Sequence, residues 1–317
     1  MVVHPDYKMW ADSYFSLRSS PEARRAVKWH YNRLKTLKTH KKAFWPKAPS
    51  RVPFDDADYS GPDGVQYSFD APGIRAFRQQ HRTVTAPVFA KAALALINTW
   101  KTGHDHALFS NLEAARTNFP FITKAMAERG QYEATDVAGP CIQGVVNLVQ
   151  IKPDESVANF LIRMQEDQTN LTKYASAPLR DLISSLGDAG DMLPQVIQSQ
   201  VYNWVPGQSS QHSAPSHTVV SSSPANNQQG MSATGTNPYN NFEVLAAVVR
   251  PQVGLAFNCG MGGPEGDTIF MHVRGDSLSD DEMLTMAKEI EQVVLWMVDQ
   301  SHWNQPAVGA LDTLSAQ

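Results

Sequence analysis

His104 and His106 are the first residues in this chain whose type and spacing could support chemistry. Two histidines separated by one residue lie on the same side of a strand, where their imidazoles can offer two ligands to a metal ion. Here they fall in a turn and at the start of a predicted strand, and no cysteine or acidic residue at ligand spacing completes a set. The sequence therefore predicts no metal site.

Other reactive arrangements have simpler explanations or do not occur in the sequence. Asp280 and Asp281 could act as an acid and base pair, but they stand at the start of a predicted helix, where acidic side chains stabilise the helix dipole. The sequence contains no Gly-x-Ser-x-Gly elbow, phosphate-binding glycine-rich loop or dinucleotide fingerprint. Hydrolase, kinase and nicotinamide-dependent functions therefore lack support, and we expect no cofactor.

The charge and cysteine content restrict the partners. The formal net charge of −4 provides no extended cationic surface for nucleic acid or an anionic membrane. Cys141 and Cys259 lie far apart in differently patterned segments, which indicates free thiols and a reducing compartment. No segment resembles a signal peptide or approaches the roughly 20 apolar residues of a membrane span. We expect a soluble cytoplasmic protein that binds a small apolar molecule, and neither nucleic acid nor a membrane.

The order of the predicted elements favours one α/β domain over residues 1–317, with a mixed sheet covered by helices. Strand patterns lie near residues 65, 107, 143, 245, 255 and 269. Helical patterns occupy residues 7–17, 21 to about 37, 85–101, 156–168 and 279–299. Residues 207–241 are rich in Ser, Asn, Gln, Gly and Pro, a composition too poor in apolar side chains to offset the entropy of ordering. This segment is predicted to be a mobile insertion.

Six segments follow one another in an order that is typical of one protein family. They are His4–Trp10, Thr83–Thr85 with the helix and Thr102-Gly103 after it, Asn111–Arg116, Gly139–Val149, Ser156–Asp167 and Tyr202-Asn203-Trp204. In this order they resemble the later motifs of nonribosomal-peptide condensation domains, which belong to the chloramphenicol-acetyltransferase-like superfamily. The fourth segment departs from the family's Gly-Pro-x-x-Asn-x-x-Pro-x-Arg pattern, because Gln143 and Leu148 stand near the positions of its Asn and Arg. The resemblance implies a single lobe, corresponding to the C-terminal half of such a domain.

The resemblance also indicates what the chain lacks and where its site would be. Condensation domains carry a His-His-x-x-x-Asp-Gly motif upstream of the first matching segment, and this sequence does not contain it. His272 and Asp276 form the sole His-x-x-x-Asp match, at the end of a predicted strand that corresponds to an ordinary terminal strand of the family. They are the candidate catalytic residues. Tyr202, Asn203 and Trp204 are the candidate substrate-binding residues, from motif position and residue chemistry.

Three functions remain open at this stage. The first is an enzyme of secondary metabolite biosynthesis, a cyclase of the Diels-Alderase type, that folds a substrate in an apolar pocket without an acyl-transfer histidine. The second is an acyltransferase or condensation activity that uses a substitute base such as His272, or a partner that supplies the missing lobe. The third is a noncatalytic partner domain. A homo-oligomer is a further arrangement that the sequence leaves open.

Overall fold

The computed structural model describes residues 7–47, 64–115, 119–122, 137, 141–205, 253–263 and 265–314. The predicted insertion at residues 207–241 and the predicted strand near residue 245 lie outside these ranges, so neither prediction is tested. None of the helices in the described ranges is long and apolar enough to cross a bilayer.

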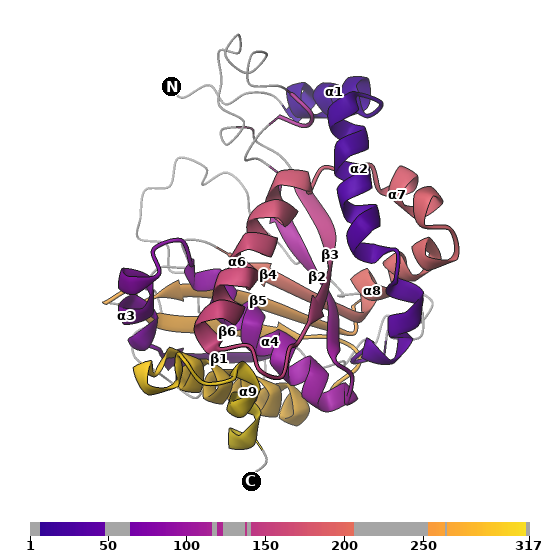
Figure 1. The fold of residues 1–317 in the computed structure, drawn as a ribbon. Coiled ribbons are helices and arrows are strands. Elements are labelled where there is room, and N and C mark those ends of the chain that lie inside the picture. The colour runs from indigo at the N-terminus through magenta and orange to yellow at the C-terminus, as the bar shows by residue number, and fades with distance from the viewer. Residues whose placement is uncertain are drawn as a thin grey trace, which may run out of the picture.

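A six-stranded mixed sheet forms the centre of the fold (Figure 1). Its spatial order is β1 (Val65–Asp70), β6 (Thr268–Arg274), β5 (Leu255–Gly262), β4 (Gln200–Trp204), β2 (His106–Ala114) and β3 (Ile142–Gln150). Strand β4 runs parallel to both β2 and β5, while the other neighbours are antiparallel. The predicted mixed α/β sheet is confirmed, and β4 is a central strand that the periodicity did not predict.

One face of the sheet is covered by helices that carry the main hydrophobic core (Figure 1). These helices are α4 (Ala86–Thr102), α6 (Val157–Tyr174) and α9 (Asp280–Val298), with α3 (Gly73–Gln80) beside them. Phe89 of α4 and the strand residues Phe109 and Phe257 are fully buried in this core. Helix α6 runs to Tyr174, beyond the predicted end at residue 168. Gln168 and Thr172 face the sheet but are polar, because they donate hydrogen bonds to the buried Glu113. The apolar period that predicts a helix therefore stops before the helix does.

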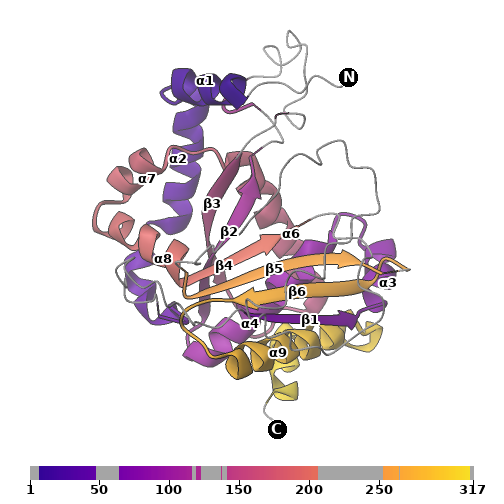
Figure 2. The ribbon, with the colours of Figure 1, turned by 180° about the vertical axis from the view of Figure 1, so that it is seen from behind.

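The other face is covered only beside β2 and β3 among the described elements (Figure 2). There a second core packs Leu108 and Val146 against helices and 3-10 turns from two parts of the chain. The elements on this side are α2 (Pro21–Leu34), η1 (Leu37–Ala43), α7 (Leu179–Leu186), η3 (Gly187–Met192) and α8 (Leu193–Ser199). Helix α1 (Tyr7–Leu17) lies beyond the ends of β2 and β3, where Trp10 packs against Ala115 and Cys141. Figure 2 shows β4, β5 and β6 with no described helix in front of them.

Local signals determine where the helices begin and end. Ser20 caps α2 by accepting a hydrogen bond from the backbone N–H of Ala23, as its position before a proline predicts. Ser279 and Glu282 form a reciprocal capping box at the start of α9. Helix α2 ends at Leu34 rather than near residue 37, and η1 then buries its two apolar ends. The C-terminal turns η4 (Gln300–His302) and η5 (Ala307–Thr313) pack beside α9.

Candidate functional site

A row of polar side chains crosses the face of the sheet that lies opposite α4 and α9. The strand register pairs Gln66 of β1 with His272 of β6, His272 with Asn258 of β5, and Asn258 with Asn203 of β4. Directly paired residues project from the same face. Asn203 Nδ2 donates a hydrogen bond to Asn258 Oδ1 at 3.0 Å. We call these four residues the polar row.

The polar row lies on the face of the sheet that Figure 2 presents, where no described helix lies in front of β4, β5 and β6. Gln66 is exposed, whereas Asn203, Asn258 and His272 are half-buried. The amides can donate and accept hydrogen bonds, and the imidazole can do either according to its tautomer. The row therefore offers directional contacts to a bound molecule.

An apolar pocket lies beside β2 and β3, the two strands that continue the register from Asn203. Asn203 pairs with Leu112 of β2, which pairs with Gly144 of β3, and both of these residues line a cavity of about 340 Å³. The wall combines residues of α2, β2, β3, α7, α8 and the α6–α7 connection: His30, Leu34, Leu112, Ile142, Gln143, Gly144, Val145, Val146, Ala175, Ala177, Leu179, Leu182, Leu193 and Ile197. The apolar pocket and the polar row thus lie on adjoining strands.

His30 of α2 is a polar residue in the wall of the apolar pocket and is 2% exposed. Its Nε2 lies 3.0 Å from the carbonyl oxygen of Tyr174, an arrangement in which Nε2 carries the proton and donates it. Nδ1 is then an acceptor, and it is buried with no hydrogen-bond partner among the described residues. Burial lowers the pKa of His30 to about 4, so the side chain is neutral at pH 7.

The structure divides the residues predicted for the site between the two faces. Asn203 and His272 lie in the polar row, on the face opposite α4 and α9. Tyr202 points toward the helices, where its hydroxyl donates to the carbonyl oxygen of Pro87 at 2.7 Å, and burial raises its pKa well above the usual value. Trp204 packs against the main core on that same side. The sheet therefore does not gather the Tyr-Asn-Trp segment into one pocket.

Asp276 lies beyond the end of β6 and outside the polar row. Its backbone N–H donates to the carbonyl oxygen of Val253 at 3.2 Å, which joins the segment after β6 to the segment before β5. Sequence reasoning linked Asp276 to His272 by spacing alone, and it did not select His30 or Asn258. No sequence signal identifies these two, because the pocket wall and strand register that give them a role are tertiary.

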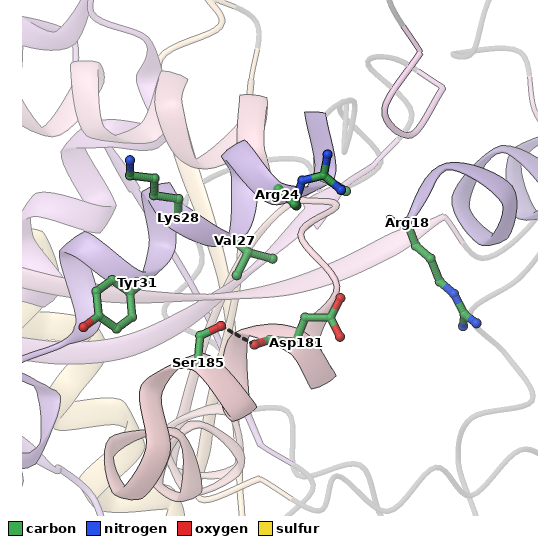
Figure 3. A pocket seen from close by; sticks show the side chains of 8 residues that line it. Arg18, Arg24, Val27, Lys28, Tyr31, Asp181 and Ser185 are labelled. Atoms are coloured by element: carbon green, nitrogen blue, oxygen red, sulfur yellow. Dashed lines mark hydrogen bonds between the residues drawn. The ribbon is translucent and has the colours of Figure 1, made fainter. Parts of the chain in front are cut away.

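A second hollow lies between α2 and α7, with a volume of about 440 Å³ (Figure 3). Figure 3 shows Arg24 and Lys28 on one side and Asp181 and Ser185 on the other. The Ser185 hydroxyl donates to the backbone carbonyl of Asp181 within α7, at 2.7 Å. The charged side chains of this groove are exposed to water. The groove therefore lacks a buried polar side chain such as His30 in the apolar pocket.

Comparison with solved structures assigns the fold to a known class. The chain is similar to the first condensation domain of the calcium-dependent antibiotic synthetase in complex with a substrate analogue, with a TM-score of 0.59 and 10% identity over 95% of this chain and 58% of that one. No protein-family model and no curated protein sequence matches the chain. The architecture is that of a single condensation-domain lobe.

Two further structures support the same class. The starter condensation domain of rhizomide synthetase has a TM-score of 0.55 at 9% identity, over 92% of this chain and 56% of that one. The epimerization domain from the third module of tyrocidine synthetase B has a TM-score of 0.57 at 10% identity, over 94% of this chain and 60% of that one. The chain therefore spans less than two thirds of the length of these structures.

Proposed function

We propose that this protein binds a small, largely apolar biosynthetic intermediate and promotes its cyclisation, for example by a [4+2] cycloaddition. The observation that carries the proposal is the strand register, which pairs Asn203 of the polar row with Leu112 and Leu112 with Gly144, two residues that line the apolar pocket. An apolar chain fits the pocket, and a carbonyl or hydroxyl group on the same molecule can reach the amides. Sites for small molecules commonly combine an apolar wall with a few placed polar groups.

The chemistry requires positioning more than proton transfer. A pocket that holds the two reacting ends of a molecule in contact restricts its conformational freedom before the reaction begins. This lowers the entropic part of the activation barrier. Hydrogen bonds from the amide N–H groups of Asn203 and Asn258 to a conjugated carbonyl withdraw electron density from the reacting alkene. Because such donors are fixed by the sheet, they need little reorganisation as the reaction proceeds.

Acyl transfer is the second candidate, and the position of His272 favours it. The imidazole is half-buried on the sheet face opposite α4 and α9, in register between Gln66 and Asn258, and so lies beside the amide that would bind a substrate carbonyl. In that reaction His272 would accept the proton of an alcohol or amine as its oxygen or nitrogen bonds to a thioester carbonyl. The C–S bond then breaks, and the proton passes from His272 to the departing thiolate.

Product mass distinguishes the two candidates. The purified full-length chain is incubated with a metabolite extract from its source organism after deletion of its gene, and the products are followed by liquid chromatography and mass spectrometry. Cyclisation converts a metabolite into an isomer of identical mass. Acyl transfer gives a product heavier by an acyl group. If neither conversion occurs, the catalytic proposals fail and the noncatalytic alternative remains.

Filling the apolar pocket tests its part in the reaction. A Cβ atom at Gly144 would meet only Ile197, at 3.9 Å, so Gly144→Val is compatible with the strand and places its methyl groups beside the cavity wall. We expect at least a tenfold loss of conversion with an unchanged melting temperature. Ala114→Val is the matched control, because Ala114 is an exposed residue on the neighbouring strand. Equal activity of Gly144→Val and wild type would show that the substrate does not bind in the apolar pocket.

His272→Ala separates cyclisation from acyl transfer by its effect on turnover. Cyclisation should continue within a few fold of wild type, since no base is needed. Acyl transfer should fall by about a hundredfold or more, the usual contribution of a general base. His302→Ala is the control, because His302 is also half-buried but stacks on Trp296 in the helical layer. Melting temperatures show whether a loss of activity is caused by unfolding.

A further inference from the structure

Three histidines and an aspartate meet where η1 passes the start of β2. Each of His40, His104, Asp105 and His106 offers one ligand atom, and these atoms all lie within 4.8 Å of one another. The rings of His40 and His106 have their centroids 4.0 Å apart, and those of His40 and His104 are 5.4 Å apart. Asp105 Oδ1 lies 2.8 Å from His106 Nδ1 and 3.1 Å from His104 Nδ1.

The side chains of the histidines in this cluster are sheltered while the carboxylate faces water. The side chains of His104 and His106 are 17% and 16% exposed, whereas that of Asp105 is 65% exposed. Nδ1 of His40 is buried and has no hydrogen-bond partner in the part of the chain that the structure describes. A sheltered imidazole nitrogen without a partner is costly unless a ligand satisfies it. The cluster therefore contains a buried nitrogen, His40 Nδ1, without a partner among the described residues, and neighbouring side chains that could bind the same metal ion.

The donor atoms of the cluster suit a cation. A neutral imidazole binds a metal ion through the lone pair of its unprotonated ring nitrogen, and a carboxylate binds through its ionised oxygens.

We propose that His40, His104, Asp105 and His106 form a binding site for a divalent transition metal ion, with zinc as the best-fitting ion. Imidazole ligands favour zinc and its transition-metal neighbours over magnesium and calcium, which prefer oxygen. Zinc bonds of about 2.1 Å place tetrahedral ligand atoms roughly 3.4 Å apart. The cluster therefore needs side-chain shifts of about 1 Å at its widest pair, which rotations about χ1 and χ2 can supply.

The metal would join segments that are distant in sequence. His40 belongs to the 3-10 turn after α2, and the other three ligands belong to the turn after α4 and the first residue of β2. Phe44 and Leu108 form an isolated parallel bridge immediately beyond this point. The ion would therefore fix η1 against the sheet. His106 lies six residues along β2 from Leu112, about 20 Å at the rise of a strand, so this site is separate from the apolar pocket.

Metal titration of the full chain tests the proposal directly. Protein stripped with a chelator is titrated with zinc chloride by calorimetry, and cobalt is added in parallel for its visible absorption in a tetrahedral nitrogen and oxygen site. We expect one zinc ion per chain, a rise in melting temperature with zinc, and a tetrahedral cobalt spectrum. His40→Gln and His106→Gln should each weaken zinc binding at least a hundredfold. Asp105→Asn should weaken it about tenfold to a hundredfold.

His302→Gln is the matched control, since it removes a half-buried histidine outside the cluster and should leave zinc affinity unchanged. Circular dichroism of each metal-free variant checks the fold. If His40→Gln does not fold, the exposed Asp105→Asn and the cobalt spectrum of wild type still decide. Absence of stoichiometric zinc binding by wild type would overturn the proposal, as would equal affinity in folded His40→Gln or His106→Gln. None of these measurements depends on the reaction proposed for the pocket.

Discussion

Acidification should weaken the fold through His30, which lines the apolar pocket. The pKa of this histidine is about 4 in the folded chain, because burial disfavours its charged form, against 6.5 in a solvated one. Between these two values the unfolded chain binds more protons than the folded chain. The free energy of unfolding therefore falls as the pH is lowered through this window, and the effect is complete below about pH 4.

The size of the effect follows from the two pKa values. At pH 5 an unfolded His30 is almost fully protonated and a folded one about one tenth protonated. Linkage then gives a loss of about 2 kcal/mol in the free energy of unfolding relative to pH 7. This is a substantial fraction of the 5–15 kcal/mol that is typical of a folded domain. The side chain is 2% exposed, so solvent screening reduces the figure little.

The measurement compares wild type with His30→Gln, whose amide can still donate a hydrogen bond toward the carbonyl of Tyr174. Urea unfolding is followed by circular dichroism at pH 7 and pH 5, and the difference between the two free energies is taken for each protein. Other titrating groups contribute to both proteins and cancel. We expect the pH-dependent loss to be about 2 kcal/mol smaller in the variant. Equal losses in both proteins would refute the burial of a neutral His30.

Three substitutions in or beside the main hydrophobic core should change stability by different amounts. Tyr202→Phe leaves the carbonyl of Pro87 without its donor and should cost about 1–2 kcal/mol in urea unfolding. The same variant should retain catalytic conversion, because Tyr202 faces away from the polar row. Ser279→Ala removes the capping box of α9 and should cost about 1 kcal/mol, read from the urea midpoint. Phe257→Ala opens a cavity in the main core and should cost roughly 3–5 kcal/mol. A cost below about 1 kcal/mol for this last variant would contradict the burial of Phe257 in the main core.

The sequence by itself determined the features that depend on neighbouring residues. Capping residues such as Ser20 and the acids after Ser279 act within one helical turn, so the starts of α2 and α9 are readable from the chain. Alternating and helical apolar periods likewise predicted five of the strands in the sheet and its principal helices. The order of these elements predicted a mixed α/β domain, and the resemblance of six ordered segments to a known family implied the condensation-domain type.

Only the tertiary structure decided which polar residues meet. Strand β4 has five residues and is parallel to both neighbours, so its pairing depends on distant segments and leaves little periodic signal. Its register places Asn203 beside Asn258 and turns Tyr202 to the opposite face, because successive strand residues alternate in direction. In the same way, His40 joins His104 and His106 through the path of η1. Such contacts join residues that are far apart in the sequence, so they depend on how the whole chain packs. The local sequence around each residue does not predict them.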